Sequence, residues 1–135
     1  MRRHPWIPAL IDLVLIVAFA AIGMSSHEES VSVATLATVA WPFLAGAAIG
    51  WLVSLAWKNP AAPLRTGVPV WILAAGGGMA LRVLTGGGFA VPFLVVTLIV
   101  LAVFLIGWRE IAALVVRIRA KRGASSQSER RLDAR

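Results

Sequence analysis

Two ionisable residues, Asp12 and Arg82, lie inside long apolar stretches of the chain. An ionised side chain at the centre of a membrane-spanning helix costs about 2.5–3.5 kcal/mol, so such a residue needs a partner or a function. A carboxylate in this setting can carry protons, and an arginine can hold an anionic group. These residues therefore indicate either a structural ion pair or a path for protons or a solute.

The depth of the two residues leaves several partners open. At about 1.5 Å per residue, Asp12 lies about 8 Å from one edge of the apolar layer and Arg82 about 20 Å from it. One interpretation is a direct Asp12–Arg82 pair. Another is that Arg82 extends to the nearer surface and meets His27, Glu28 or Glu29. Asp12 could instead pair with a basic residue at the inner edge, or be protonated against a hydroxyl.

Other residues near these charges could add polar groups within the membrane. A proline inside a helix frees a backbone carbonyl, and a run of glycines can expose carbonyls to a cavity. The candidate intramembrane polar site therefore comprises Asp12, His27, Pro42, Gly78 and Arg82. The alternative is that the glycines allow close helix contact and that the charges fix how the helices align.

Other kinds of chemistry have little support in the sequence. The chain has no cysteine, and its two histidines, His4 and His27, lie at opposite ends of the first apolar run. The glycine runs 76–78 and 86–88 lack the lysine and the preceding strand of a phosphate-binding loop. We expect no catalytic residue, no metal site and no cofactor, and we expect that the protein is not an enzyme.

The elements that carry the polar residues are four apolar runs. Apolar residues make up 59% of the chain and charged residues only 14%, which favours lipid over water. The runs cover about residues 7–24, 31–57, 68–84 and 89–108, and each reaches or approaches the length that crosses a bilayer. The sequence predicts an all-α, polytopic transmembrane four-helix bundle, with residues 1–116 as the membrane domain.

The basic residues predict the orientation of this bundle. The chain carries a net charge of +7, and every Lys and Arg except Arg82 lies before the first run, between the second and third, or after the fourth. The positive-inside rule then places both termini in the cytoplasm. We expect a multi-pass protein of the bacterial inner membrane that binds no nucleic acid. Four tryptophans at the inner ends of the runs predict an interfacial belt: Trp6, Trp57, Trp71 and Trp108.

Two further segments bear on partners. Gly46 and Gly50 form a GxxxG motif, which lets helices approach closely, either within one chain or with a homo-oligomer or membrane partner. Residues 117–135 are basic and rich in serine, so we expect a disordered cytoplasmic tail that serves as an orientation anchor or touches anionic lipid.

Spaced motifs over roughly residues 9–109 resemble the bacterial membrane family called domain of unknown function 3054. Asp12, Phe19, Gly23 and His27 resemble its opening motif. Residues farther along the chain resemble the later motifs of this family: Trp41-Pro42-Phe43, Gly46, Gly67, Trp71, Gly78-Met79, Arg82 and Gly107-Trp108-Arg109. Met24 departs from the pattern, because a basic residue is expected there. The resemblance implies a four-span protein common in actinobacteria, and it implies no activity.

Two functions remain as hypotheses. The first is a structural or partner-binding membrane subunit without catalysis, which would use the Gly46/Gly50 face. The second is a small solute transporter or proton-coupled transporter, in which Asp12 couples the proton and Arg82 holds an anionic group.

Overall fold

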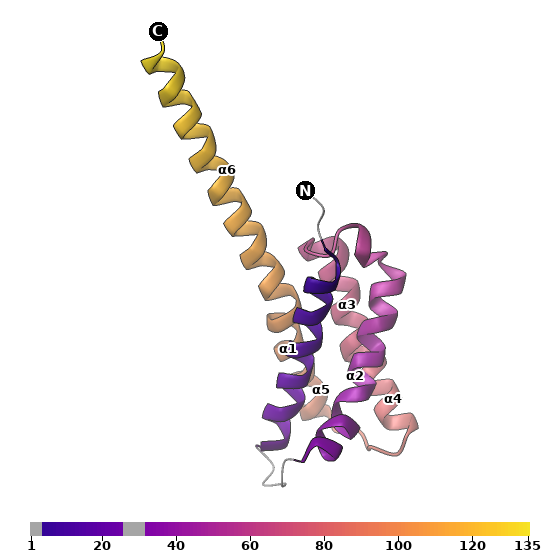
Figure 1. The fold of residues 1–135 in the computed structure, drawn as a ribbon. Helices are drawn as coiled ribbons and strands as arrows, with labels where there is room; N and C mark the ends of the chain where they lie inside the picture. Colours follow the sequence, from indigo (N-terminus) through magenta and orange to yellow (C-terminus); the bar gives the residue numbers. More distant parts are fainter. Residues whose placement is uncertain (1–3, 26–31) are drawn as a thin grey trace.

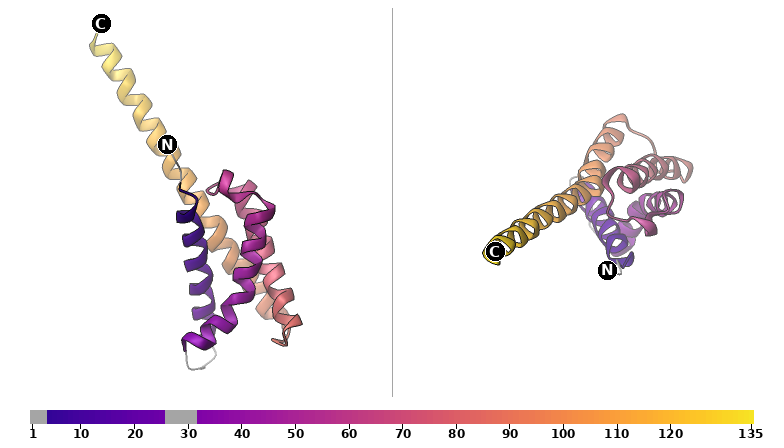
Figure 2. Two further views of the ribbon diagram at one scale, coloured as in Figure 1. Left: turned by 45° about the vertical axis from the view of Figure 1, so that its right-hand side comes forward. Right: turned by 90° about the horizontal axis from the view of Figure 1, so that it is seen from above.

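The computed structural model describes residues 4–25 and 32–135, and every regular element in these two segments is helical. Four of the helices are long and apolar enough to cross a membrane. The predicted all-α membrane bundle is therefore confirmed. Figures 1 and 2 show that α1 begins and α6 leaves at the same end of the bundle.

The first two spans are single helices. The first span is α1 (Trp6–Ser25), and the second is α2 (Val33–Val53). Ser32 caps the start of α2, because its hydroxyl accepts a hydrogen bond from the Thr35 N–H at 3.1 Å. Pro42 lies inside α2, and Figure 2 shows that this helix bends along its length, as expected when a backbone hydrogen bond is lost. The second span ends before the predicted residue 57, because Leu55 adopts a left-handed conformation (φ 52°).

The third span is one continuous helix that changes its winding. It consists of η2 (Pro63–Gly67), α3 (Val68–Ile72), η3 (Leu73–Gly77) and α4 (Gly78–Leu84), in which η2 and η3 are wide π-helical turns. It begins five residues before the predicted residue 68, since a proline at the first helical position costs nothing. Much of the predicted inner loop is thus helical, and only the short turn η1 (Ala56–Lys58) and the residues around Pro60 link it to α2.

The fourth span continues far beyond the bundle. It comprises α5 (Val91–Leu101), the π-helical turn η4 (Ala102–Ile106) and α6 (Gly107–Asp133). The prediction of a disordered tail over residues 117–135 is wrong, because α6 runs to Asp133. Its Ala, Arg, Lys, Glu and Gln residues favour helix. A helix that extends an existing span also avoids the unfavourable nucleation step.

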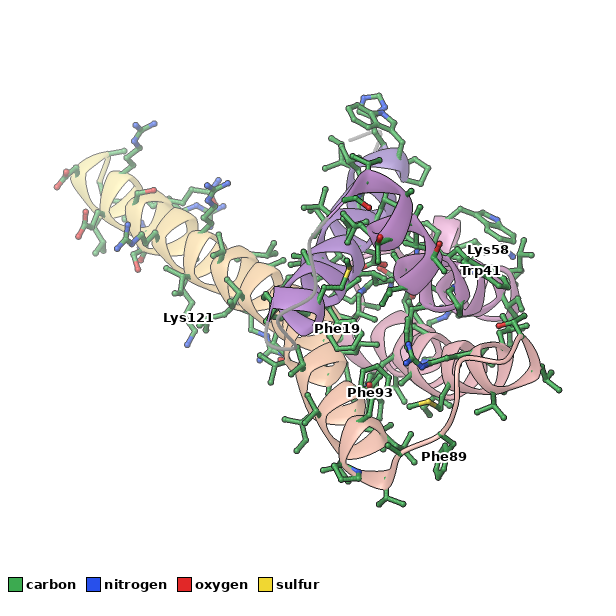
Figure 3. The ribbon with its side chains drawn as sticks, turned by 90° about the horizontal axis from the view of Figure 1, so that it is seen from below. Phe19, Trp41, Lys58, Phe89, Phe93 and Lys121 are labelled. Carbon is green, nitrogen blue, oxygen red and sulfur yellow. The ribbon has the colours of Figure 1, made fainter. Side chains whose placement is uncertain are left out.

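The core lies where all four spans meet. Its buried apolar side chains come from every span: Ile16, Phe19, Phe43, Ala47, Val70, Ala74, Ala75, Leu101 and Leu105. Phe19 and Phe43 meet edge to face with ring centroids 5.4 Å apart, and Figure 3 shows Phe19 and Phe93 in the interior between the helices. The core therefore fixes the depth at which the polar residues of neighbouring spans face each other.

Candidate functional site

A buried ion pair joins the first span to the beginning of α6. Asp12 is 2% exposed and Arg109 is fully buried. The Arg109 guanidinium donates to both carboxylate oxygens, from Nη1 to Oδ1 at 2.9 Å and from Nη2 to Oδ2 at 2.7 Å. This two-point contact suits the planar geometry of both groups and gives the pair a fixed orientation.

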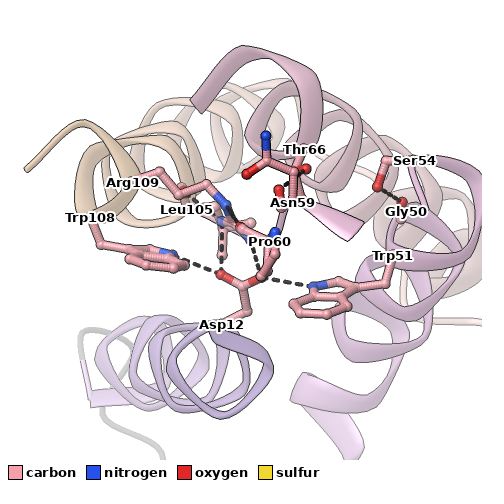
Figure 4. A network of polar contacts seen from close by, with 10 residues as sticks. All are labelled: Asp12, Gly50, Trp51, Ser54, Asn59, Pro60, Thr66, Leu105, Trp108 and Arg109. Carbon is pink, nitrogen blue, oxygen red and sulfur yellow. Dashed lines mark hydrogen bonds and ion pairs between the residues drawn. The ribbon is translucent and has the colours of Figure 1, made fainter. Parts of the chain in front are cut away.

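Two tryptophans complete the environment of the Asp12 carboxylate. The Trp108 Nε1–H donates to Oδ1 at 2.8 Å and the Trp51 Nε1–H donates to Oδ2 at 2.9 Å. Figure 4 shows the two indoles approaching Asp12 from opposite sides. Each carboxylate oxygen therefore accepts two hydrogen bonds, which uses the acceptor capacity of an ionised carboxylate.

Arg109 also reaches the segment between α2 and the third span. Its Nε–H donates to the Pro60 carbonyl at 2.9 Å, and Nη1 donates to the Leu105 carbonyl at 2.7 Å. The guanidinium carbon lies 4.6 Å from the centre of the Trp108 ring. The cluster of Asp12, Trp51, Trp108 and Arg109, which we call the polar lock, thus connects three spans and the inner turn.

The polar lock is chemically closed. Within the described residues, no buried side-chain nitrogen or oxygen lacks a hydrogen-bond partner. An apolar groove of about 650 Å³ between α1 and α2 borders Asp12 and Trp51, but the carboxylate is already saturated by its four donors. The described part of the chain also brings no three His, Asp or Glu side chains together to hold a metal ion. Every acceptor position of the Asp12 carboxylate is therefore occupied from within the bundle.

The comparisons with known proteins give a family. The model of DUF3054, a protein family of unknown function, matches residues 9–112. The chain belongs to the DUF3054 family. This match covers all four members of the polar lock, and it confirms the resemblance seen over residues 9–109. No curated protein and no solved structure matches the chain.

In this DUF3054 protein, Arg82 is remote from Asp12. It lies in the last turn of α4, at the opposite end of the bundle from the polar lock, and its guanidinium carbon stands 4.7 Å from the centre of the Phe93 ring. The predicted direct Asp12–Arg82 pair is therefore wrong. Asp12 instead pairs with Arg109, in agreement with the alternative interpretation of a basic partner at the inner edge. His27, Glu28 and Glu29 lie outside the described residues, so their predicted contact with Arg82 stays a prediction.

The other members of the predicted polar site serve packing. A Cβ at Gly78 would lie 2.9 Å from the Phe43 Cα, so this glycine lets α4 approach α2. Pro42 is buried within α2. The predicted grouping of Gly78 and Pro42 with Asp12 is thus not found, because the core between them is filled by the Phe19 and Phe43 rings.

The GxxxG motif is used within the chain. A Cβ at Gly46 would collide with the Leu73 carbonyl oxygen, and one at Gly50 would lie 2.7 Å from the Val70 Cα. This face of α2 is covered by the third span, so it is not free to receive a homo-oligomer or membrane partner. The predicted location of a partner-binding face is corrected accordingly.

Sequence reasoning missed the roles of Arg109, Trp51 and Trp108. Arg109 and Trp108 lie at the inner end of the fourth run, at the same depth as Asp12 in the first, and this shared depth is the signal that could have found them. Trp71 and Trp108 were predicted to form a belt at the interface. Instead, their indole N–H groups donate inside the bundle, to the Leu98 carbonyl at 2.9 Å and to Asp12. Trp6 and Trp57 remain largely exposed.

Proposed function

We propose that this DUF3054 protein is a non-catalytic, partner-binding protein of the bacterial inner membrane, with both termini in the cytoplasm. The observation that carries the proposal is the closed state of the polar lock, in which four hydrogen bonds saturate Asp12. The basic inner loops and termini support the orientation. Arginine-rich composition and the family resemblance support an actinobacterial source.

The polar lock argues against Asp12 as a coupling carboxylate. A coupling carboxylate must exchange its partners during transport, whereas both oxygens of Asp12 are held by Trp51, Trp108 and a fully buried Arg109. Breaking one partner of a buried ion pair typically costs about 3–5 kcal/mol. A site that must exchange its partners during transport needs a much smaller penalty.

The partner-binding element that we propose is α6. From Leu114 onward its residues are exposed, and Figure 1 shows this helix projecting from the bundle. Residues 111–128 contain Arg117, Arg119, Lys121 and Arg122 and no acidic residue. We infer a protein partner with an acidic surface, since complementary charges steer association and select the partner.

The polar lock would give such a helix a fixed direction. Trp108 and Arg109 occupy the first turn of α6 and bind Asp12, so the start of the projecting helix is attached to the first span. Because the helix is continuous, its basic segment keeps a defined position relative to the membrane. A docking element that is ordered before binding loses less entropy when its partner arrives.

A site-specific crosslinking experiment tests the proposal. A photoreactive amino acid is placed at Ile118 of the full chain, and cells are irradiated before extraction in detergent. We expect a discrete adduct with a second protein. The adduct should disappear when Arg119, Lys121 and Arg122 are all changed to Glu, because the charge complementarity is reversed.

The control changes charges outside the proposed surface. Arg130→Glu with Arg131→Glu alters basic residues of the same helix and should leave the adduct in place. A strictly monomeric, adduct-free protein in every sample would reject the proposal.

The alternative function is a small solute transporter that uses Arg82. The observation in its favour is that three cavities border this arginine. It predicts flux of an anionic solute in proteoliposomes that is lost in Arg82→Gln, while Asp12 contributes through stability alone. Absence of flux for a panel of anionic solutes would count against it.

A further inference from the structure

Arg82 is the only charged side chain among the described residues at its end of the bundle. It lies in the last turn of the third span, which runs from Pro63 to Leu84. At about 1.5 Å per residue, this position lies about 28 Å along the helix from Pro63, which is close to the thickness of the hydrocarbon layer. The guanidinium is therefore at the depth of the lipid head groups on the side opposite to α6.

The guanidinium has no ionic partner within the described residues. Its contact there is the face of the Phe93 ring, 4.7 Å away, and the side chain is only partly buried. A cation–π contact of this kind uses the ring face and leaves the N–H groups at the guanidinium edge unused. This contrasts with Arg109, whose three nitrogens all donate to oxygens of the bundle.

Space for an anion surrounds the guanidinium. A cavity of about 320 Å³ lies between Arg82, Trp41 and Gly87, and a second of about 240 Å³ lies between Arg82, Phe89 and Phe93. A smaller apolar cavity of about 130 Å³ extends from Arg82 toward Phe19. In Figure 3, Phe93 lies between the helices, whereas Trp41 and Phe89, both exposed, lie farther out.

The glycine-rich loop after α4 supports the arginine side chain. Gly86 and Gly88 adopt positive φ angles of 88° and 75°, which glycine accepts without strain. The Gly87 N–H donates to the Arg82 carbonyl at 2.8 Å. A Cβ at Gly87 would lie 2.6 Å from the Arg82 Cγ, so the loop wraps closely around the aliphatic part of this side chain. The charged group is held and its edge is left open to the cavities.

We propose that Arg82 binds a phosphate oxyanion at the end of the bundle opposite to α6. The planar guanidinium can donate two parallel hydrogen bonds to phosphate oxygens. The phosphate belongs either to a phospholipid head group or to a soluble phosphate. This inference is independent of the proposed function, because binding at Arg82 requires neither α6 nor transport.

Binding measurements on the full chain in a neutral detergent test the proposal. Inorganic phosphate is titrated at constant ionic strength, and retention of phosphatidylglycerol is measured by native mass spectrometry. We expect Arg82→Gln to weaken binding of at least one probe about tenfold or more, because the charged hydrogen bonds to the phosphate are lost. The matched control is Arg65→Gln, an exposed arginine near the other end of the same span, which should leave binding unchanged.

The outcomes separate the sources of the phosphate. Arg82-dependent retention of the lipid alone assigns a head-group site, and Arg82-dependent binding of inorganic phosphate assigns a site for soluble phosphates. Equal affinities in Arg82→Gln and Arg65→Gln would overturn the proposal. It would also be overturned if binding arose only after Glu28→Gln and Glu29→Gln, because acidic residues of the chain would then occupy the arginine.

A second pair of variants covers the case in which Arg82→Gln does not fold. Arg82→Lys keeps the charge and removes the planar fork, so it should weaken phosphate binding more than Arg65→Lys does. Equal affinity in these two variants would overturn the proposal as well.

Discussion

At the scale of single residues, the polar lock explains how a charged pair is tolerated in a small membrane bundle. Asp12 and Arg109 neutralise each other, and Trp51, Trp108 and the Pro60 carbonyl satisfy the remaining hydrogen-bonding groups around them. The pair thereby avoids most of the penalty for burying a charge. Its cost becomes visible when one member is removed.

Removal of one charge should destabilise the bundle. Asp12→Asn leaves the Arg109 guanidinium buried without its counter-ion, and we expect a loss of about 3–5 kcal/mol in the free energy of unfolding. Equilibrium unfolding in mixed detergent micelles measures it. In a double-mutant cycle, Asp12→Asn and Arg109→Gln should couple by about 0.5–3 kcal/mol, as contacting residues do.

Arg82→Gln is the control for this cycle. Its effect should add to that of Asp12→Asn, because the two residues share no partner and lie at opposite ends of the bundle. Strong coupling between positions 12 and 82 would contradict the pairing described above.

The tryptophan donors allow a more selective test. Trp51→Phe and Trp108→Phe each remove one hydrogen bond to the Asp12 carboxylate and keep an aromatic ring, so each should lower stability by about 1–2 kcal/mol. Trp57→Phe changes an exposed indole with no hydrogen bond to a described residue, and it should be neutral. Equal effects in all three variants, measured by thermal unfolding, would show that ring size and not hydrogen bonding matters.

At the scale of the elements, small residues determine how the spans pack. Gly46 and Gly50 bring α2 into backbone contact with the third span, and the π-helical turn η3 lies at this contact. Lipid supplies no hydrophobic drive between helices, so close packing of this kind is a main source of stability. The fourth helix lacks such close packing in its second half, because that half leaves the bundle and contacts no other span.

Substitution of a packed glycine and of a glycine that faces open space should differ in their effect on stability. Gly46→Ala places a methyl group against the Leu73 carbonyl, and overpacking of a close contact typically costs about 1–3 kcal/mol. Gly76→Ala is the matched control, since a Cβ there meets open space. It should be neutral or slightly stabilising through its higher helix propensity. The midpoint of thermal unfolding measures both, and an unchanged midpoint in Gly46→Ala would contradict the close packing.

At the scale of the whole molecule, the four spans bring the beginning of α1 and the start of α6 to one end of the bundle, together with the basic inner turn (Figure 1). We propose that this end faces the cytoplasm, because basic loops are retained on the cytoplasmic side.

Reporter fusions test this orientation. A fusion at Gly87 and a fusion at the carboxyl terminus should report opposite compartments, with the carboxyl terminus in the cytoplasm. The physical reason is that one span, the fourth, lies between Gly87 and the carboxyl terminus. Fusions that report the same compartment would refute the four-span arrangement.

The sequence alone was sufficient for the class of the fold. Apolar runs of spanning length, separated by loops with proline, glycine and charge, predict four helices, because only helices and closed barrels satisfy the backbone in lipid. The ends of the spans were less well predicted. Pro63 begins a helix instead of continuing a loop, Leu55 ends one early, and α6 continues through residues whose polarity suggested disorder.

The pairing of residues in the candidate site could not be predicted from the sequence. The sequence identified Asp12 and Arg82 as costly, since that follows from their charge and from the apolar residues around them. Only the tertiary structure decided that Asp12 pairs with Arg109 and that Arg82 stands alone among the described residues at the far end. Pairing depends on how the helices are rotated and stacked, and that is determined by side-chain packing between distant segments. Hydropathy along one helix carries no information about its neighbour.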